Sequence, residues 1–362
     1  MVSLYWPARR RPGGSAAGWS YADSVETVKL SPGEQLAGQA ERVEQLTAAV
    51  SNSRVGNAEL AWLGREVAAA VRNQVPPIVK DWALLSADGV DFAAVELEAN
   101  LGSDGPTEAE IWLHPNSDPA SVLPAALGVC RDFAREHGRN QLTVWYLHAS
   151  ADEQLRSPTG IGSVGRDVVA DLLVSAGARL AQVYRVSEVD PLESGAPEPP
   201  ADGYRLVHWF GPTPARWRAQ VAAMHEITMA DAPTGETGYV AEEFTAERVA
   251  ADEASAVEAG RLLVSVLALA PDDAVAGLTQ VAVQGGTTLA YQWDTSVASG
   301  HRGRGLGRSL KTLAAALVRE QYPQVRRIIT HNAADNIHML RINTNLGWRP
   351  LAHKGLWSLS VS

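Results

Sequence analysis

The chain has 362 residues, of which 46% are hydrophobic and 20% charged, and its formal net charge is −10. This length suits two domains of ordinary size, each with enough apolar residues for a core. The acidic balance excludes a general nucleic-acid or anionic-membrane binder, because neutralising phosphates requires a surplus of Lys and Arg. The one cysteine, Cys130, lies in an apolar helical run. We predict a buried thiol without a disulfide, in a cytoplasmic protein.

The first half of the chain alternates between helical and extended patterns. Apolar residues recur either at helical spacing or in short runs bounded by turn residues. The predicted helices are 35–50, 59–72, 121–137 and 168–176, and the predicted strands are 92–101, 108–114, 141–148 and 181–189. We therefore expect an α/β (α+β) fold, a mixed twisted sheet flanked by helices.

A proline-rich segment, 191–202, follows the first half. It holds four prolines together with Gly, Ser and acidic residues, which neither a helix nor a sheet interior tolerates. We predict a linker here, between an N-terminal domain at 1–190 and a C-terminal domain at 203–362.

The second half repeats the order of elements. The predicted strands are 204–210, 261–270, 274–283, 289–297, 326–331 and 354–360, and the predicted helices are 214–229, 246–259, 309–320 and 336–345. Residues 142–152 also parallel 325–335 in sequence, and 174–179 parallel 344–349. This pattern indicates an internal duplication.

The segment from His301 to Gly307 reads His-Arg-Gly-Arg-Gly-Leu-Gly, between a predicted strand and a predicted helix. Glycines let a ligand approach the backbone, and a helix N-terminus attracts anions, so the arrangement predicts a phosphate site. The glycines alternate and Arg308 follows them, which does not fit a dinucleotide fingerprint, and the Gly-Lys of a Walker loop is absent. The loop therefore indicates a different phosphorylated cofactor.

A second motif lies in segment 330–348. Asn332 stands at the end of the next predicted strand, Asn336 opens the following helix, and Leu346-Gly347-Trp348 follows that helix. With Arg302-x-x-Gly305-x-Gly307 before it, the C-terminal half resembles the GCN5-related N-acetyltransferases (GNAT), which use acetyl-CoA. The doubled chain resembles the tandem members of this family that are familiar in actinobacteria.

The resemblance implies two tandem GNAT-like domains, of which only the second, 203–362, binds acetyl-CoA. In the first, Pro115 to Pro119 stands where the loop should be, with no cation, so we expect a degenerate copy. It would serve packing, the substrate cleft or a second subunit rather than a second active site. The residues that the resemblance places beside acetyl-CoA are Thr295, Ser296, Val297, Arg302, Gly303, Arg304, Gly305, Leu306, Gly307, Arg308, Asn332, Asn336 and Asn343.

Acetyl transfer to an amine needs a proton acceptor for the amine and benefits from an acid for the departing thiolate. Family members often carry a tyrosine acid where this chain has Asn343, and a glutamate base where it has Tyr291. Tyr291 and the nearby Asp294 are therefore candidates, as are carboxylates of the segment that covers the acceptor pocket in the family. The catalytic candidates are Asp294, Tyr291, Glu242 and Asp231. No residue spacing predicts a metal site.

The sequence thus predicts an acetyl-CoA-dependent N-acetyltransferase that acts on a small amine, such as a metabolite or an antibiotic, by direct transfer in a ternary complex. It would bind neither nucleic acid nor membranes and would be a monomer or homodimer. Two alternatives stay open. One is a CoA-binding sensor or assembly protein without turnover, suggested by the missing tyrosine, and the other is an O-acyltransferase.

Overall fold

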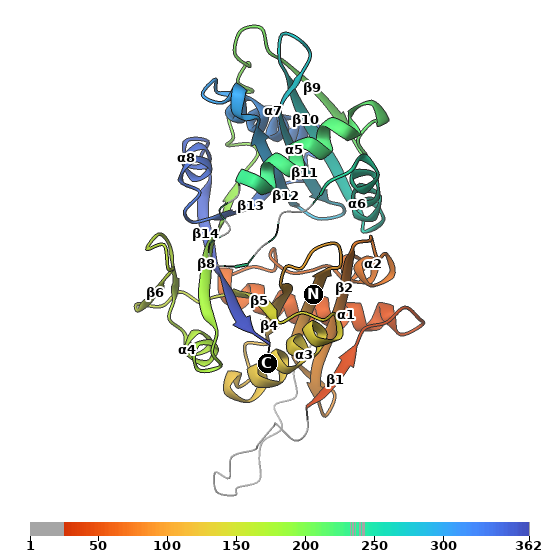
Figure 1. Cartoon of the computed structure of the whole chain (residues 1–362), viewed down its shortest axis with the longest axis vertical. Coiled ribbons are helices and arrows are strands. Elements are labelled where there is room, and N and C mark those ends of the chain that lie inside the picture. Colours follow the sequence, from red (N-terminus) through yellow and green to blue (C-terminus); the bar gives the residue numbers. More distant parts are fainter. Residues whose placement is uncertain are drawn as a thin grey trace, which may run out of the picture.

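The computed structural model describes residues 25–231, 233, 235, 237, 238, 240 and 243–361. Two lobes lie one above the other, and two long strands, β8 (Arg179–Val189) and β14 (Arg349–Ser360), run between them (Figure 1). The predicted α/β architecture with a mixed sheet is confirmed.

The elements of the N-terminal half are β1 (Glu26–Lys29), α1 (Leu36–Val55), α2 (Gly64–Arg72), β2 (Ile78–Ala87), β3 (Val90–Asn100), β4 (Thr107–Leu113), α3 (Pro119–Glu136), β5 (Gln141–Leu147), β6 (Gln154–Arg156), β7 (Ser163–Gly165), α4 (Val168–Ser175) and β8 (Arg179–Val189). The predicted elements of this half all form. The sequence did not indicate β1, β2 or the small β6–β7 hairpin, and the second helix begins at Gly64 rather than at residue 59.

The elements of the C-terminal half are β9 (Arg205–Phe210), α5 (Arg218–Asp231), α6 (Ala246–Glu258), β10 (Arg261–Leu269), β11 (Val275–Gln284), β12 (Leu289–Val297), α7 (Leu306–Gln321), β13 (Arg327–Ala333), α8 (Ile337–Asn345) and β14 (Arg349–Ser360). Helix α7 begins three residues before its predicted start, directly at the glycine-rich loop. Residues 190–204 connect β8 to β9 without helix or strand.

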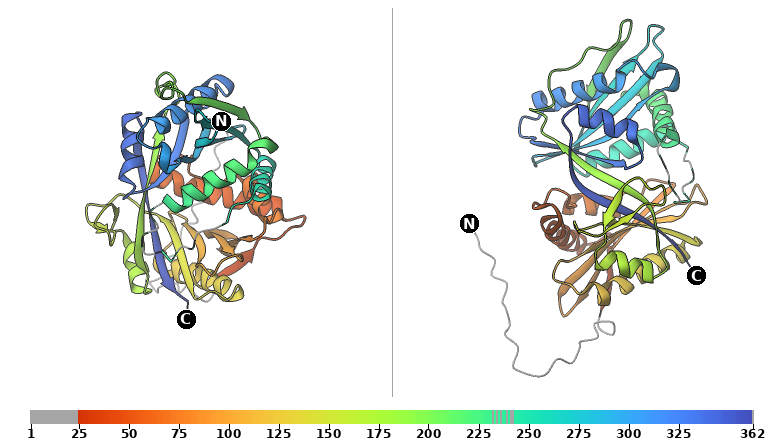
Figure 2. Two further views of the ribbon diagram at one scale, coloured as in Figure 1. Left: turned by 45° about the horizontal axis from the view of Figure 1, so that its top comes forward. Right: turned by 90° about the vertical axis from the view of Figure 1, so that its left-hand side faces the viewer.

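The two halves share one sheet because they exchange strands. Its order among the described residues is β1-β2-β3-β4-β5-β14-β8-β13-β12-β11-β10-β9. The C-terminal strand β14 pairs with β5 of the first half, and β8 of the first half pairs with β13 of the second. Figure 2 shows β8 and β14 crossing side by side between the lobes. Neither half therefore has a complete sheet of its own.

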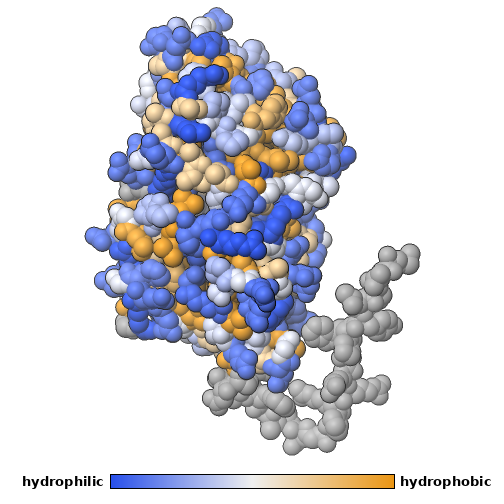
Figure 3. Space-filling view, turned by 90° about the vertical axis from the view of Figure 1, so that its right-hand side faces the viewer, coloured by the Kyte–Doolittle hydropathy of each residue, from blue (hydrophilic) through white to orange (hydrophobic). Residues whose placement is uncertain are grey.

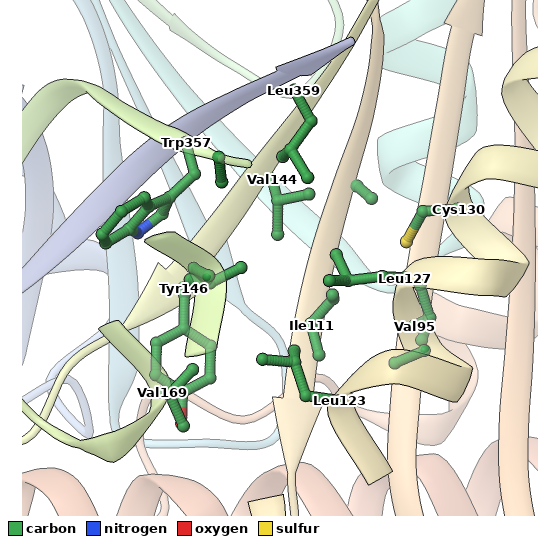
Figure 4. Close-up of a cluster of buried hydrophobic side chains, with 14 of the residues drawn as sticks. Val95, Ile111, Leu123, Leu127, Cys130, Val144, Tyr146, Val169, Trp357 and Leu359 are labelled. Carbon is green, nitrogen blue, oxygen red and sulfur yellow. The ribbon is translucent and has the colours of Figure 1, made fainter. Parts of the chain in front are cut away.

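The exchanged strand β14 also completes the core of the N-terminal half. Trp357 and Leu359 are buried in a cluster with Val144 and Ile111 (Figure 4). Cys130 belongs to the same cluster, and burial raises the pKa of its thiol to about 12. The thiol is free and buried, as predicted from its apolar run.

The lobes also meet on the side that carries α2 and α6. Arg65 of α2 donates to the carbonyl oxygens of Ala259 and Gly285 in the second half. On this side, hydrophilic residues gather at the height where the lobes meet (Figure 3). Strands β8 and β14 and this Arg65 contact thus hold the lobes together from two sides.

We predict that residues 203–362 alone do not fold stably, because β13 and β14 then lack β8 between them. Circular dichroism and thermal melting of this fragment should show no cooperative transition. The intact protein cut once within residues 191–202 should keep both fragments associated and melt as the intact chain does. A fragment 203–362 with the melting temperature of the full chain would contradict the shared sheet.

Candidate active site

The N-terminus of α7 is open toward solvent and has no side-chain cap. Gly303 and Gly305 adopt left-handed φ angles of 75° and 74°, which favour glycine, and nothing lies where a Cβ would be. Among the described residues, nothing accepts a hydrogen bond from the backbone N–H groups of 303–307. With the dipole of a 16-residue helix behind them, these donors form an anion cradle.

The arginines around this cradle contact other parts of the chain. Arg302 donates to the Val297 carbonyl oxygen and pairs with Asp231 at the end of α5. Arg308 pairs with Glu198 of the connecting segment, whose carboxyl pKa is lowered by this hydrogen bond. The structure thus places Asp231 beside the cradle, and it is not among the residues that line the cavity described below. If a phosphate bound in the cradle, Arg302 could leave Asp231 and pair with the phosphate. Breaking this half-exposed ion pair costs little free energy.

We predict that Gly305→Val abolishes binding of acetyl-CoA, because a β-branched residue disfavours the left-handed conformation that aligns the cradle. Titration calorimetry should show at least a 100-fold loss of affinity. Gly138→Val is the matched control, since Gly138 has a φ of 66°, open space around it and a place at the far end of α3. If Gly305→Val and the wild type bind acetyl-CoA with equal affinity, the loop is not part of the cofactor-binding site.

Strand β12 parts from its parallel neighbour β13 next to this cradle. Their pairing ends at Tyr291 and Ile329, and β13 continues only along β8. Opposite Thr279 to Val281 of β11, β12 also carries a bulge around Trp293 and Asp294. Beyond Tyr291 the outer backbone edge of β12, including Thr295 to Val297, is therefore free to bind an extended ligand as an added strand would.

A cavity of about 460 Å³ begins where β12 and β13 part. The C-terminal lobe lines it with Tyr291 to Asp294 and with Ile329 to His331. The N-terminal lobe lines it with the β3–β5 face of its sheet and with the turn before α2. The remaining lining residues are Leu60, Ala61, Trp62, Glu66, Glu96, Glu98, Glu108, Ala109, Glu110, Trp112, Trp145, Arg261 and Lys354. The site is thus shared between the two halves.

Four of these lining residues are glutamates on neighbouring strands. Glu96 and Glu98 of β3 lie directly opposite Glu110 and Glu108 of β4. We call these four residues the acidic floor. Sequence reasoning missed it, although the alternating Glu-x-Glu of both segments is a visible signal. In each strand the residues between point into the apolar core, so the period of two places both acids on the cavity face.

Glu96 has the most perturbed carboxyl group of the acidic floor. Burial raises its pKa to about 8, with a further increase from Glu110 and Glu98 and a partial offset from Lys80 and Lys354. Burial lowers the pKa of Lys80, but Glu98, Glu96 and Glu108 more than reverse this, so its net pKa is raised. Glu96 is therefore largely protonated at pH 7, whereas Glu98 and Glu110 lie beside Lys80 and Lys354.

We predict that Glu96→Gln stabilises the protein at high pH. The folded state holds a proton on Glu96 up to about pH 8, whereas the unfolded chain releases it near pH ~4.3. Wild-type stability should therefore fall as pH rises from ~4.3 to 8, and the variant should lack this decrease. Urea unfolding at pH 5, 7 and 9 should show a gain of about 1–3 kcal/mol at pH 9. A less stable variant at pH 9, with an unchanged exposed control such as Glu258→Gln, would contradict this.

Asp294 and His225 form a close pair at the edge of the cavity. The His225 Nδ1 lies 2.5 Å from the Asp294 carboxylate, and the His225 ring contacts that of Phe244. Asp294 lines the cavity at the bulge, just past the last pair with β13. The sequence named this carboxylate as a candidate but did not pair it with His225 of α5.

Two further ionisable groups of the cavity are less suited to proton transfer. The Tyr291 hydroxyl donates to the Glu59 carbonyl oxygen at 3.0 Å, and burial raises its pKa. The His331 side chain lines the cavity between the lobes. Burial and Lys354 lower the pKa of His331 to about 3, so it is neutral at pH 7 and a weak base. Glu242, another predicted candidate, lies outside the described residues.

The three asparagines of the second motif have structural partners. The Asn336 side chain caps α8 by accepting from the Met339 N–H, and the buried Asn343 donates to the Asn332 side chain at 2.8 Å. Ser296 of β12 likewise donates to the Met224 carbonyl oxygen. Asn332 and Asn343 thus join β13 to α8 beside the place where β12 and β13 part.

The corresponding place in the N-terminal half is closed. Asp118 caps α3, accepting from the Ala120 N–H and the Ser121 hydroxyl, so a carboxylate occupies that helix N-terminus. The strands β4 and β5 part after Glu110, and there Tyr146 packs with Ile111 in the core (Figure 4). Of the two corresponding helices α3 and α7, only α7 has an open anion cradle at its N-terminus.

Among the residues that the structure describes, no cluster of three or more metal-binding side chains is present. No helix of this part of the chain is long and apolar enough to cross a membrane.

Two lobes of this topology on one continuous sheet, with a glycine-rich cradle after a strand that parts from its neighbour, define a tandem GNAT fold. Residues 221–348 match the model of the acetyltransferase (GNAT) family. Residues 221–348 therefore form a domain of the GNAT family, whose members transfer acyl groups from acyl-CoA. No curated protein matches the sequence.

Solved structures agree with this fold along almost the whole chain. A tandem GNAT protein from the clavulanic acid biosynthesis pathway, in a structure without acetyl-CoA, is 23% identical, with a TM-score of 0.73 over 93% of this chain and 99% of that chain. A GCN5-related N-acetyltransferase from Sphaerobacter thermophilus is 14% identical, with a TM-score of 0.64 over 92% and 96%. These similarities show the tandem fold.

Proposed function

We propose that the protein is an acetyl-CoA-dependent N-acetyltransferase with one active site, in the cavity between its two halves. The observation that supports this most is continuity. The cradle at α7, the free edge of β12 and the cavity follow one another along one strand. A cofactor with a diphosphate at one end and an acyl thioester at the other fits such a path.

The residues of the cradle fit this cofactor by their chemistry. The N–H groups of 303–307 would bind phosphate oxygens, and Arg302 and Arg304 would add charge. When bound, acetyl-CoA supplies the activated acyl group. The chain would position the cofactor along the edge of β12. The N-terminal lobe forms the opposite wall of the cavity and so limits the access of bulk water.

Asp294 is the residue we assign to take the proton of the attacking amine. It lies at the bulge, beside the point where the path from the cradle reaches the cavity. His225 holds the carboxylate in place through the 2.5 Å contact. The thiolate needs no strong acid, because its leaving tendency is already good at neutral pH. We propose that the acetyl group passes directly from acetyl-CoA to the amine while both are bound.

The first test is release of free CoA thiol when the full chain is incubated with acetyl-CoA and a panel of primary amines. We expect amine-dependent release and acetylated product by mass spectrometry. Binding of acetyl-CoA without release across the panel would favour a CoA-binding sensor instead, and release with alcohols alone would indicate O-acyl transfer.

We predict that Asp294→Asn lowers kcat about 100-fold or more, because a general base contributes this much, while the affinity for acetyl-CoA changes little. Tyr291→Phe is the matched control on the same strand. Its hydroxyl already donates to Glu59, so kcat should fall by less than about fivefold. Steady-state kinetics of both variants tests the assignment. If Tyr291→Phe lost activity and Asp294→Asn kept it, Tyr291 rather than Asp294 would be the catalytic residue.

A further inference from the structure

We propose that Lys311 is the inner cation of the anion cradle, and that it takes up a proton from solvent when the diphosphate of acetyl-CoA binds there. The affinity for the cofactor then depends on pH. This inference rests on the proposed function, because it concerns how that active site holds its cofactor. Its evidence is the burial of Lys311, its place on α7 and its lack of a counter-ion among the described residues.

Lys311 is buried inside the C-terminal lobe without an anionic partner. The residue is only 3% exposed. Its Nζ lies 4.6 Å from the centre of the Trp348 ring, and Trp348 belongs to the buried apolar cluster of this lobe. Among the described residues, this Nζ has no ion-pair partner and no hydrogen-bond acceptor. An aromatic ring replaces only part of the lost hydration, so the neutral amine is favoured.

The elements packed around Lys311 in the described part of the chain are apolar, exposed or already paired. The strands β10, β11 and β12 contribute Val264, Val266, Ala276, Val281, Val283 and Ala290 to the same apolar cluster. The ionisable residues of α8, His338 and Arg341, are exposed. Glu198 of the connecting segment is paired with Arg308. Burial therefore lowers the pKa of Lys311 to about 7, and no neighbouring charge offsets this.

Packing alone does not require a lysine at this position. A methionine of similar length would fill the same space without the cost of burying an amine that lacks a hydrogen-bond acceptor. A buried ionisable group with a perturbed pKa beside a binding site is typical of a functional residue. Lys311 is therefore better explained by the adjacent cradle than by the core.

Lys311 lies directly behind the cradle. It follows Gly307, the last glycine of the loop, by four residues, so both lie on one face of α7. Side chains of a helix lean toward its N-terminus, and Lys311 therefore extends back over the turn that begins at Gly307. Gly307 has no side chain to fill that turn, and a Cβ there would lie 3.5 Å from Ile342. The ammonium group thus approaches the open end of the helix from inside the lobe.

An anion in the cradle would change the protonation of Lys311. Four helical residues rise about 6 Å, so a diphosphate bound to the N–H groups of 303–307 lies close to this amine. Negative charge at such a distance, inside a protein, favours the charged form of an amine. Lys311 then binds a proton from solvent. Because binding includes proton uptake, the affinity must fall as the pH rises above about 7.

The experiment is titration calorimetry of the full chain with acetyl-CoA in PIPES and in Tris, two buffers with different ionisation enthalpies. The difference between the two heats gives the number of protons taken up. At about pH 7.5 most of Lys311 is neutral before binding, so we expect uptake of about 0.5–0.75 proton. Between about pH 7.0 and 8.5, where phosphate monoesters are already ionised, the affinity should fall about tenfold.

Lys311→Met keeps the length of the side chain and removes its charge. This variant should bind acetyl-CoA at least about tenfold more weakly than the wild type near pH 7, with no proton uptake and little dependence on pH. Arg308→Met is the matched control on the same helix. It removes a cation that is charged at every pH used, so it should weaken binding equally across the range and keep the proton uptake. Circular dichroism verifies the folding of both variants.

Equal proton uptake by Lys311→Met and the wild type would overturn the inference, as would cofactor binding by the wild type without proton uptake. The proposed function would stand in both cases, because thiol release measures it separately. Conversely, proton uptake that depends on Lys311, without thiol release for any acceptor, would support the inference and overturn the proposed function. If the wild type does not bind acetyl-CoA at all, both are wrong.

Discussion

The exchange of β8 and β14 between the halves is the constraint on which the rest of the structure depends. Because each half completes its sheet with a strand of the other, the halves cannot separate without breaking three strand pairings, β5–β14, β14–β8 and β8–β13. This fixes the acidic floor of one lobe opposite the diverging strands β12 and β13 of the other. The cavity is therefore a property of the whole chain, and neither half contains it.

Duplication followed by specialisation explains how the two lobes differ. In the C-terminal lobe, glycines leave the N-terminus of α7 uncapped, which weakens the helix end but leaves donors for a ligand. In the N-terminal lobe, Asp118 caps α3 and Tyr146 fills the core where β4 and β5 part. One lobe has an open anion cradle at the expense of local stability, and the other has more packing at that place and supplies a wall of the cavity.

The sequence predicted most elements of this fold because their patterns are local. The cradle from His301 to Gly307 and the order of strands around it needed only spacing and turn chemistry. Strand β2 was missed because Lys80 and Asp81 interrupt its apolar run, and only the sheet shows Lys80 beside Glu98. The exchange of β14 was beyond reach, since pairing between residues some 200 positions apart leaves no local pattern.

The candidate site shows the same division. Residues near the cradle were identified from motifs, whereas the pairing of His225 with Asp294 joins α5 to β12 across 69 residues. The floor had a local signal in its Glu-x-Glu segments, but its meaning depends on the register that sets Glu96 against Glu110. In the sequence, these alternating glutamates are typical of the exposed face of a strand. In the structure they line a cavity, because the second lobe covers that face.

We propose that the doubled chain holds a single cofactor site, in its C-terminal half, facing a cavity built by both halves. The stoichiometry of acetyl-CoA binding to the intact chain, measured by titration calorimetry, tests this most directly. We expect one equivalent of acetyl-CoA per chain. Two equivalents would contradict it, because the capped α3 and the closed β4–β5 separation would then have to open to a second cofactor.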